Sequence, residues 1–270
     1  MTPARKSKET QAKALEVLWG GERPLPARGP KPGLSVEKIA AAAIRIADEE
    51  GLEALSMHHV AGRLGYTAMS LYRYVPSKEQ LVDVVYDRAL GPPPAAGHAE
   101  RAAADDAGAP DAARDWRAEV HSWVRSMLAV YQQHPWLLDI TTSSPPLGPN
   151  QLAWLEALLQ AVSGIGLTNE EMLHLVIFVT GAVRDLAHTS SEMAQTPEKT
   201  GVSMEQIGEG YADALRHIAD STRFPTLSRL VETGTFEPNE TPYNDIVPSL
   251  DFGLQRLLDG VEEHVRRMRG

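Results

Sequence analysis

The chain has 270 residues, of which 43% are hydrophobic and 23% are charged, a composition that excludes a wholly disordered protein. The absence of cysteine excludes disulfide scaffolds, thiolate metal sites and cysteine nucleophiles. No apolar run is long enough to span a membrane and no secretory signal opens the chain, so we expect a cytoplasmic protein without a membrane partner.

The formal net charge of −10, taken as a whole, argues against a nucleic-acid partner. The charge is unevenly distributed, however. Residues 1–33 hold seven basic and three acidic residues. Residues 34–90 hold six basic and eight acidic residues, and residues 91–270 hold 13 basic and 25 acidic residues. The chain therefore has a basic start and an acidic body, and we expect these parts to have different roles.

Apolar residues recur at helical spacing along most of the chain and strand patterns are almost absent, so the predicted fold class is all-α. A first helix is expected at 7–19. The residues that follow it, up to 33, are rich in proline and glycine and complete a basic N-terminal extension. Ser35 is placed to cap a helix that continues to Gly51.

Three short helices are expected next, at 57–64, at 68 to about 75, and from 78 onward. Each is preceded by a residue whose side chain can cap it, namely Ser56, Thr67 and Ser77. Gly65 closes the first of these helices and Pro76 stops the second. Residues 34–90 are thus predicted to form one domain of short helices.

An Ala-, Gly- and Pro-rich stretch at 91–110 is predicted to be a flexible linker. The larger domain at 111–270 is expected to consist of long helices and one short one. Their predicted ranges are 111–133, 150–163, 169–194, 203–220, 225–233 and 249–269.

The helices at 57–64 and 68–75 are joined by Gly65-Tyr66-Thr67, which is the arrangement of a helix-turn-helix motif. Apolar residues of both helices are expected to hold the motif together: Val60, Ala61, Leu64, Leu71 and Val75. The other face of the second helix is then presented to a DNA major groove, with Thr67, Ala68, Met69, Ser70, Tyr72 and Arg73.

The run 69–81, with the sequence MSLYRYVPSKEQL, resembles the third helix and the start of the fourth in the DNA-binding domain of the TetR/AcrR family of bacterial transcription regulators. The runs at 134–138, 145–150 and 252–260 resemble the C-terminal domain of the tetracycline-repressor type. The resemblance implies a helix-turn-helix DNA-binding domain followed by a larger helical domain for effector binding and dimerisation. It implies double-stranded operator DNA and a second copy of the chain as partners.

The resemblance also implies roles for individual residues. Tyr72 and Lys78 match phosphate contacts of the family, Tyr74 and Ser56 match other contacts, and His58, Ala68 and Met69 match positions close to bases. The apolar side chains of Ala68 and Met69 could read thymine methyl groups. Arg28 and Lys31 could enter a minor groove as a basic arm, or could belong to a disordered solubilising tail.

Plainer interpretations exist for some of these residues. Tyr72 and Tyr74 lie on different faces of a helix, so at least one of them can be a core residue. Lys78 can be an ordinary solvated lysine, although a cation in the first turn opposes the helix dipole and a phosphate partner would explain it. The side chains of His58 and His59 diverge by about 100°, so no metal site is expected there.

The dimer seam is predicted on the helices at 169–187 and 249–265, two from each subunit, packed as a four-helix bundle. Their apolar stripes comprise Met172, Leu175, Val176, Val179, Val183 and Leu186 on the first helix, and Leu250, Leu254, Leu257, Leu258 and Val261 on the second. The alternative is that one stripe packs only inside its own subunit.

A small-molecule effector is expected in the larger domain, in a site with apolar walls and few polar anchors. The candidate contacts are Trp116, Val120, Trp123, Met127, Trp136, Trp154, His174, Phe178 and His188. Aromatic stripes on helices are more often core than ligand contacts, so a core role is the alternative. No cofactor and no metal are expected.

These observations predict a ligand-responsive DNA-binding transcriptional regulator, most simply a repressor that a small-molecule effector releases from its operator. A helical scaffold whose DNA-binding motif has degenerated is one alternative. An enzyme is another, but no GxSxG, HExxH or P-loop motif occurs, and no catalytic residue is assigned.

Overall fold

The computed structural model describes residues 15–20, 33–94, 115–140, 145–237 and 244–270. All regular elements in these ranges are helical, which confirms the all-α class. The chain divides into two compact units, one formed by residues 1–179 with 265–270 and the other by residues 180–264. None of the helices in the described ranges combines the length and the hydropathy that a membrane span requires.

The described part of the first unit begins with helical residues 15–19, and residues 7–14 of the helix predicted at 7–19 lie outside the described residues. Helix α2 (Val36–Glu50) comes next. The side chain of Ser35 accepts the N–H of Lys38, and Gly51 ends the helix at a φ of 83°, so both predicted boundaries of α2 are confirmed. A short 3₁₀ turn, η2 (Leu52–Ala54), was not expected; it leads into α3 (Met57–Leu64), which is capped as predicted by Ser56.

The helix α4 (Ala68–Tyr72) is shorter than predicted. The N–H groups of Tyr74 and Val75 both turn back to the carbonyl of Leu71, so the chain leaves the helical path before Pro76. Thr67 stands at the N-cap position but its side chain caps no backbone N–H; its hydroxyl lies 3.1 Å from that of Ser70 instead. Helix α5 (Lys78–Leu90) begins as predicted at Ser77, whose side chain accepts the N–H of Gln80.

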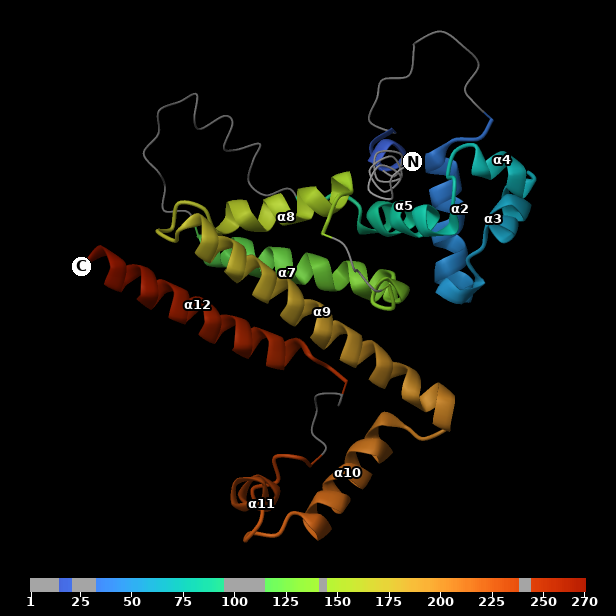
Figure 1. The fold of residues 1–270 in the computed structure, drawn as a ribbon. Coiled ribbons are helices and arrows are strands. Elements are labelled where there is room, and N and C mark those ends of the chain that lie inside the picture. The colour runs from blue at the N-terminus through green and yellow to red at the C-terminus, as the bar shows by residue number, and fades with distance from the viewer. Residues whose placement is uncertain (1–14, 21–32, 95–114, 141–144, 238–243) are drawn as a thin grey trace, which may run out of the picture. The chain divides into compact units, whose positions relative to one another are not determined.

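The rest of the first unit is built on α7 (Trp116–Gln133), the 3₁₀ turn η3 (Pro135–Leu137) and α8 (Pro149–Val162). Helix α7 begins later than the predicted residue 111, because Asp115 is its N-cap and accepts the N–H of Ala118. Helices α7 and α8 lie side by side (Figure 1). Helix α2 packs on α5, α3 on α4, and α5 on α8.

Two long helices, α9 (Asn169–Thr200) and α12 (Val247–Arg269), pass from one compact unit into the other. Helix α9 continues beyond the predicted end at 194 and accommodates Pro197 in its last turn. The second unit also contains α10 (Met204–Ile218), which a capping box of Ser203 and Gln206 opens, and α11 (Pro225–Glu232), which packs on α10.

The stripes predicted for the dimer seam are largely buried within the single chain. This holds for Leu175, Val176, Val179 and Val183 on α9 and for Leu250, Leu254 and Leu258 on α12. Burial inside the subunit was the alternative interpretation, and it corrects the assignment of these side chains to the seam. Their helices also carry exposed apolar side chains, among them Leu173, Ile177, Phe178 and Phe252.

Candidate nucleic-acid interface

The helix-turn-helix is held together by a small apolar core between α3 and α4. Val60 and Ala61 of α3 are buried, and so are Leu71 and Val75 of the second half. Leu64 is only half-buried. The packing partners predicted for the motif are therefore confirmed, with Leu64 at the edge of the cluster.

Gly65 makes the turn between the two helices possible. Its φ of 74° lies in the left-handed region, where a residue with a side chain is strained. From this conformation the N–H of Gly65 reaches the carbonyl of Gly62 at 3.2 Å, and the N–H of Tyr66 reaches that of Ala61 at 2.9 Å. The turn thus satisfies the last carbonyls of α3 and redirects the chain into α4.

One face of α4 and of the turn after it is exposed. Met69 is 74% exposed and Tyr72 is 41% exposed, and both Arg73 and Tyr74 are also exposed. Because Tyr72 and Tyr74 both reach the surface, neither is simply a core residue. Ala68 is only 8% exposed, so its burial does not support the predicted contact with a thymine methyl group.

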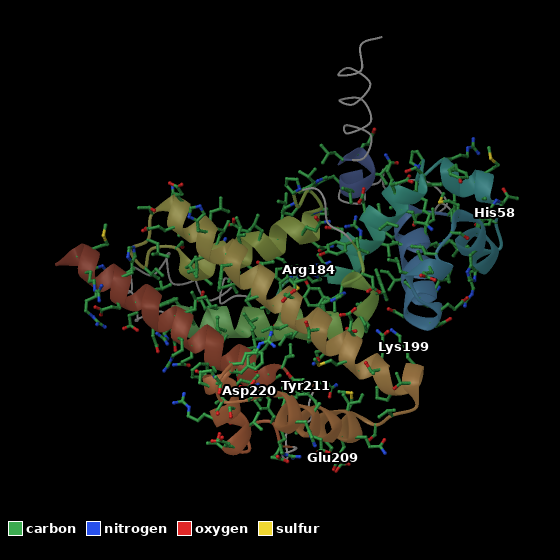
Figure 2. All side chains as sticks on the ribbon, turned by 60° about the horizontal axis from the view of Figure 1, so that its bottom comes forward. His58, Arg184, Lys199, Glu209, Tyr211 and Asp220 are labelled. Atoms are coloured by element: carbon green, nitrogen blue, oxygen red, sulfur yellow. The ribbon has the colours of Figure 1, made fainter. Side chains whose placement is uncertain are left out.

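The residues that flank α4 extend this surface. His58 is exposed and points outward from α3 (Figure 2). Lys78 is exposed at the first position of α5, next to Glu79. The pKa of Glu79 is lowered, mainly by a hydrogen bond from the Ser77 side chain and in smaller part by the charge of Lys78. Ser56 uses its oxygen to cap α3, which leaves its hydroxyl proton available to a phosphate oxygen.

The two neighbouring histidines differ in their surroundings. The Nδ1 of His59 lies 3.1 Å from the carbonyl oxygen of Ala54, and its Nε2 lies 3.4 Å from Glu50, whereas His58 points to solvent. Within the described ranges, no group of three or more metal-ligating side chains is placed to hold an ion.

The charge of the motif differs from that of its domain. Residues 34–90 are net acidic, yet no acidic residue occurs from 54 to 78, a segment that holds Arg63, Arg73 and Lys78. Glu49 and Glu50 of α2 bind Arg63 at 2.9 and 2.6 Å and raise the pKa of its guanidinium. Arg73 and Lys78 are exposed next to the end of α4, and no carboxylate of residues 54–78 opposes a phosphate there.

Arg28 and Lys31, the predicted basic arm, lie outside the described residues, as does most of the predicted linker at 91–110. The backbone at Gly33, where the described chain resumes, is held by Lys38, whose Nζ donates to its carbonyl oxygen at 2.8 Å.

The candidate effector contacts separate into distinct groups. Val120, Trp123 and Met127 of α7 and Trp154 of α8 are buried together between their helices. The indoles of Trp123 and Trp154 meet edge to face with centroids 5.5 Å apart, and Trp123 donates to the carbonyl of Trp154 at 2.9 Å. Trp116, at the start of α7, is half-buried.

The other candidates have different surroundings. His174 and Phe178 are exposed on α9. His188 belongs to the second compact unit, where its Nδ1 lies 3.5 Å from Glu192. Trp136 is buried in η3, and its indole N–H donates to Asp48 of α2 at 2.7 Å.

The contact of Trp136 belongs to a connection that was not predicted. One carboxylate oxygen of Asp48 receives the indole N–H of Trp136 and lies 2.7 Å from Nδ1 of the buried His134. This connection ties the end of α2 to the corner after α7. The partners are 86 and 88 residues apart, so no local pattern could have indicated the pairing.

Comparison with known proteins agrees with this architecture. Residues 39–85 match the family model for bacterial regulatory proteins of the tetR family, and residues 109–265 match the tetracyclin repressor-like C-terminal domain. The chain is 37% identical over 259 residues to the HTH-type transcriptional repressor DrrR1 of Streptomyces coeruleorubidus, covering 96% of this chain and 88% of that protein. It is 28% identical over 171 residues to an HTH-type transcriptional regulator of Saccharopolyspora erythraea, covering 63% of this chain and 66% of that protein.

Solved structures share the fold. ActR of Streptomyces coelicolor, in complex with actinorhodin, superposes with a TM-score of 0.63 at 22% identity, over 88% of this chain and 99% of that one. BioQ of Mycobacterium smegmatis gives a TM-score of 0.57 at 19% identity, over 86% of this chain and 99% of that one. With both domains matched in order and a helix-turn-helix formed by the residues that carry the match, the chain belongs to the TetR family of ligand-responsive, DNA-binding transcriptional regulators.

Proposed function

We propose that this regulator is a repressor that binds operator DNA as a homodimer and is released by a small-molecule effector. The observation that carries the proposal is the exposed, acid-free face of the helix-turn-helix in a domain that is otherwise net acidic. A repressor role is supported by the similarity to DrrR1, which is named a repressor. The known activity of the family gives no reason to assign catalysis, and a DNA-binding role suits a cytoplasmic protein.

The proposed DNA contacts follow from exposure and chemistry. Met69 and His58 are assigned to base edges, because Met69 is 74% exposed on α4 and His58 points outward from α3 (Figure 2). Phosphate contacts are assigned to Tyr72, Tyr74, Lys78 and Ser56, with Arg73, Thr67 and Ser70 beside them. Arg28 and Lys31 stay a prediction for a basic arm.

A second copy is required because α4 is too short to read a full operator alone. We assign the α9 side of the seam to its exposed apolar face, with Leu173, Ile177 and Phe178, and we assign the α12 side to the face that bears Phe252. The proposed seam therefore stays on the two predicted helices, but it is formed by their exposed side chains and not by the buried stripes.

The effector is proposed to be an apolar or aromatic small molecule that contacts the Trp-rich part of α7 and α8. These helices connect directly to the DNA-binding domain, since α5 packs on α8 and Asp48 binds the corner after α7. Binding that favours one arrangement of these contacts would shift the separation of the two α4 helices and so lower operator affinity.

The test is a titration of the full chain with DNA from upstream of its own gene, at several salt concentrations. We expect nanomolar, sequence-selective binding. Lys78→Gln should weaken binding to all sequences and reduce the slope of log K against log salt by about 0.9 for each phosphate that is no longer neutralised. Lys199→Gln, at an exposed position in the second compact unit, is the matched control and should leave the slope unchanged. Absence of selective binding to any such fragment would refute the proposal.

A further inference from the structure

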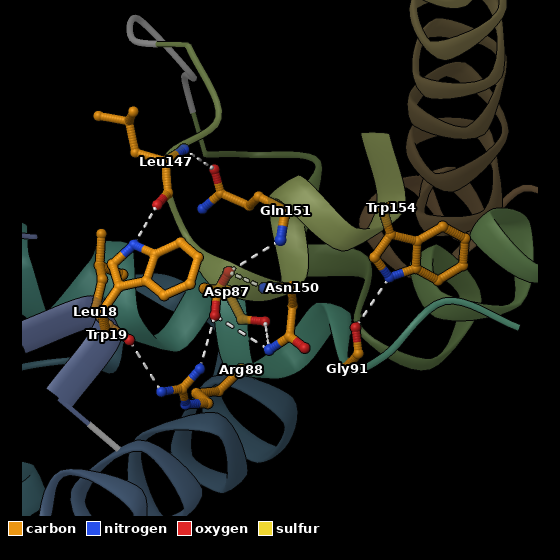
Figure 3. Close-up of polar contacts among 9 residues, drawn as sticks. All are labelled: Leu18, Trp19, Asp87, Arg88, Gly91, Leu147, Asn150, Gln151 and Trp154. Carbon is orange, nitrogen blue, oxygen red and sulfur yellow. Dashed lines mark hydrogen bonds and ion pairs between the residues drawn. The ribbon is translucent and has the colours of Figure 1, made fainter. Parts of the chain in front are cut away.

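The junction between the DNA-binding domain and the rest of the first compact unit is built on a buried carboxylate. Asp87 of α5 is fully buried, and its Oδ1 accepts the backbone N–H groups of Asn150 and Gln151 at 2.9 and 3.0 Å (Figure 3). Gly148, the N-cap of α8, has no side chain to do this. A side chain of the DNA-binding domain therefore caps a helix of the effector-binding domain.

The N-terminal extension takes part in the same junction. The indole N–H of Trp19 donates to the carbonyl of Leu147, just ahead of α8, at 2.9 Å. Arg88 donates to the carbonyl of Leu18 at 3.1 Å and, through its other nitrogen, to Asp87 at 2.9 Å (Figure 3). The polar contacts of the helical segment at 15–19 and of the residues beside it thus reach both sides of the junction.

Apolar packing holds the segment in place as well. Leu18 is buried against Ala40 of α2 and Val84 of α5, with Val17 and Val36 packed at the edge of the cluster. The segment at 15–19 therefore contacts α2, α5 and the chain just before α8, which are its neighbours in space but lie far from it in sequence.

We propose that the helical segment at 15–19 is a clasp that fixes the DNA-binding domain on the effector-binding domain of the same subunit. Trp19 binds the chain just before α8 in the effector-binding domain. Leu18 binds Arg88 of α5 in the DNA-binding domain. Operator affinity then depends on a segment that does not touch DNA, because two α4 helices can meet their half-sites together only when each domain is held at a defined angle. This last step rests on the proposed function, whereas the clasp itself does not.

The first test is amide hydrogen exchange on the full chain without DNA or ligand. Trp19→Ala should speed exchange in peptides that cover 84–91 and 145–152 by about fivefold or more, the factor that corresponds to one net hydrogen bond. Exchange at 169–179 should stay unchanged. Phe224→Ala is the matched control, because Phe224 is an aromatic residue of the second compact unit with 38% exposure against 37% for Trp19. Wild-type exchange rates at both junction peptides in Trp19→Ala would overturn the clasp.

The second test separates a clasp from a DNA-contacting arm. Trp19→Phe keeps an aromatic ring but removes the indole N–H donor, and it should weaken binding of an upstream DNA fragment by about two- to fivefold per subunit at an unchanged salt slope. A reduced salt slope would show that loosening this segment takes cations of the N-terminal extension off DNA phosphates; the extension would then act as a DNA-contacting arm, which would overturn the proposal, as would unchanged affinity. A wild-type chain that binds no fragment would count against the proposed function alone, since hydrogen exchange decides the clasp without DNA.

Discussion

At the scale of single residues, Asp87 is the most constrained acid in the described chain. Burial raises the pKa of its carboxyl, while the N–H of Gln151, the charge of Arg88 and the hydrogen bonds from Asn150 act in the opposite direction. Every one of these donors belongs to the junction, and the side-chain amide of Asn150 also donates to the backbone carbonyl of Asp87 at 3.0 Å. Asp87 is thus a structural residue whose surroundings are built to receive an acceptor.

Replacement of Asp87 by its amide tests this conclusion. In Asp87→Asn the new NH₂ group would face the donors of Arg88 and Asn150, so we expect a loss of about 2–3 kcal/mol in the free energy of unfolding. Urea denaturation measures it. Asp83→Asn, at an exposed position of the same helix, should change stability by less than about 0.5 kcal/mol. Equal losses in the two variants would contradict the assigned role.

At the scale of elements, the helix-turn-helix shows how local chemistry decides most boundaries and tertiary context decides the rest. Ser35, Ser56 and Ser77 cap their helices as predicted, because a serine cap and the N–H that it binds lie within three residues. Thr67 does not cap α4, since its hydroxyl lies against that of Ser70 instead. The helix ends early because the chain turns after Tyr72, where Leu71 and Val75 are both buried. The spacing of apolar residues does not show how that turn packs, so it could not predict the early end of α4.

We expect substitution by alanine to have opposite effects on stability at two glycines of the motif. Gly65→Ala forces a side chain into a φ of 74° and should lower the free energy of unfolding by about 1 kcal/mol. Gly62→Ala lies inside α3 with open space around its Cβ position and should raise it by about 0.5–1 kcal/mol. Thermal unfolding of both variants checks the pair. If both shift stability in the same direction, the left-handed turn is not the reason for Gly65.

At the scale of the whole molecule, the proposed dimer seam rests on the exposed apolar face of α9. Ile177 is 60% exposed beside Leu173 and Phe178 on a helix whose other face is buried in the chain. Apolar side chains gathered in this way are typical of an interface between copies.

Ile177→Asp should therefore convert the dimer to a monomer, because a carboxylate at the seam would be buried without a partner. Sedimentation velocity measures the change in mass. Met268→Asp, at a similarly exposed apolar residue of α12 outside the predicted seam, should leave the dimer intact. A dimer that survives Ile177→Asp would move the seam away from this face of α9.

The all-α class, the helix-turn-helix and most of the helix boundaries can be predicted from the residues alone, because caps, turns and helical periodicity act over a few residues. The sequence also indicated the family, through the run at 69–81. Which candidate site residues are neighbours in space depends on how the helices pack in the folded chain. In the folded chain Ala68 is buried, Phe178 is exposed while Trp123 is buried, and Trp19 is hydrogen-bonded to Leu147 across 128 positions. Such pairings depend on how the helices pack, and packing energies are set by contacts that no local pattern contains.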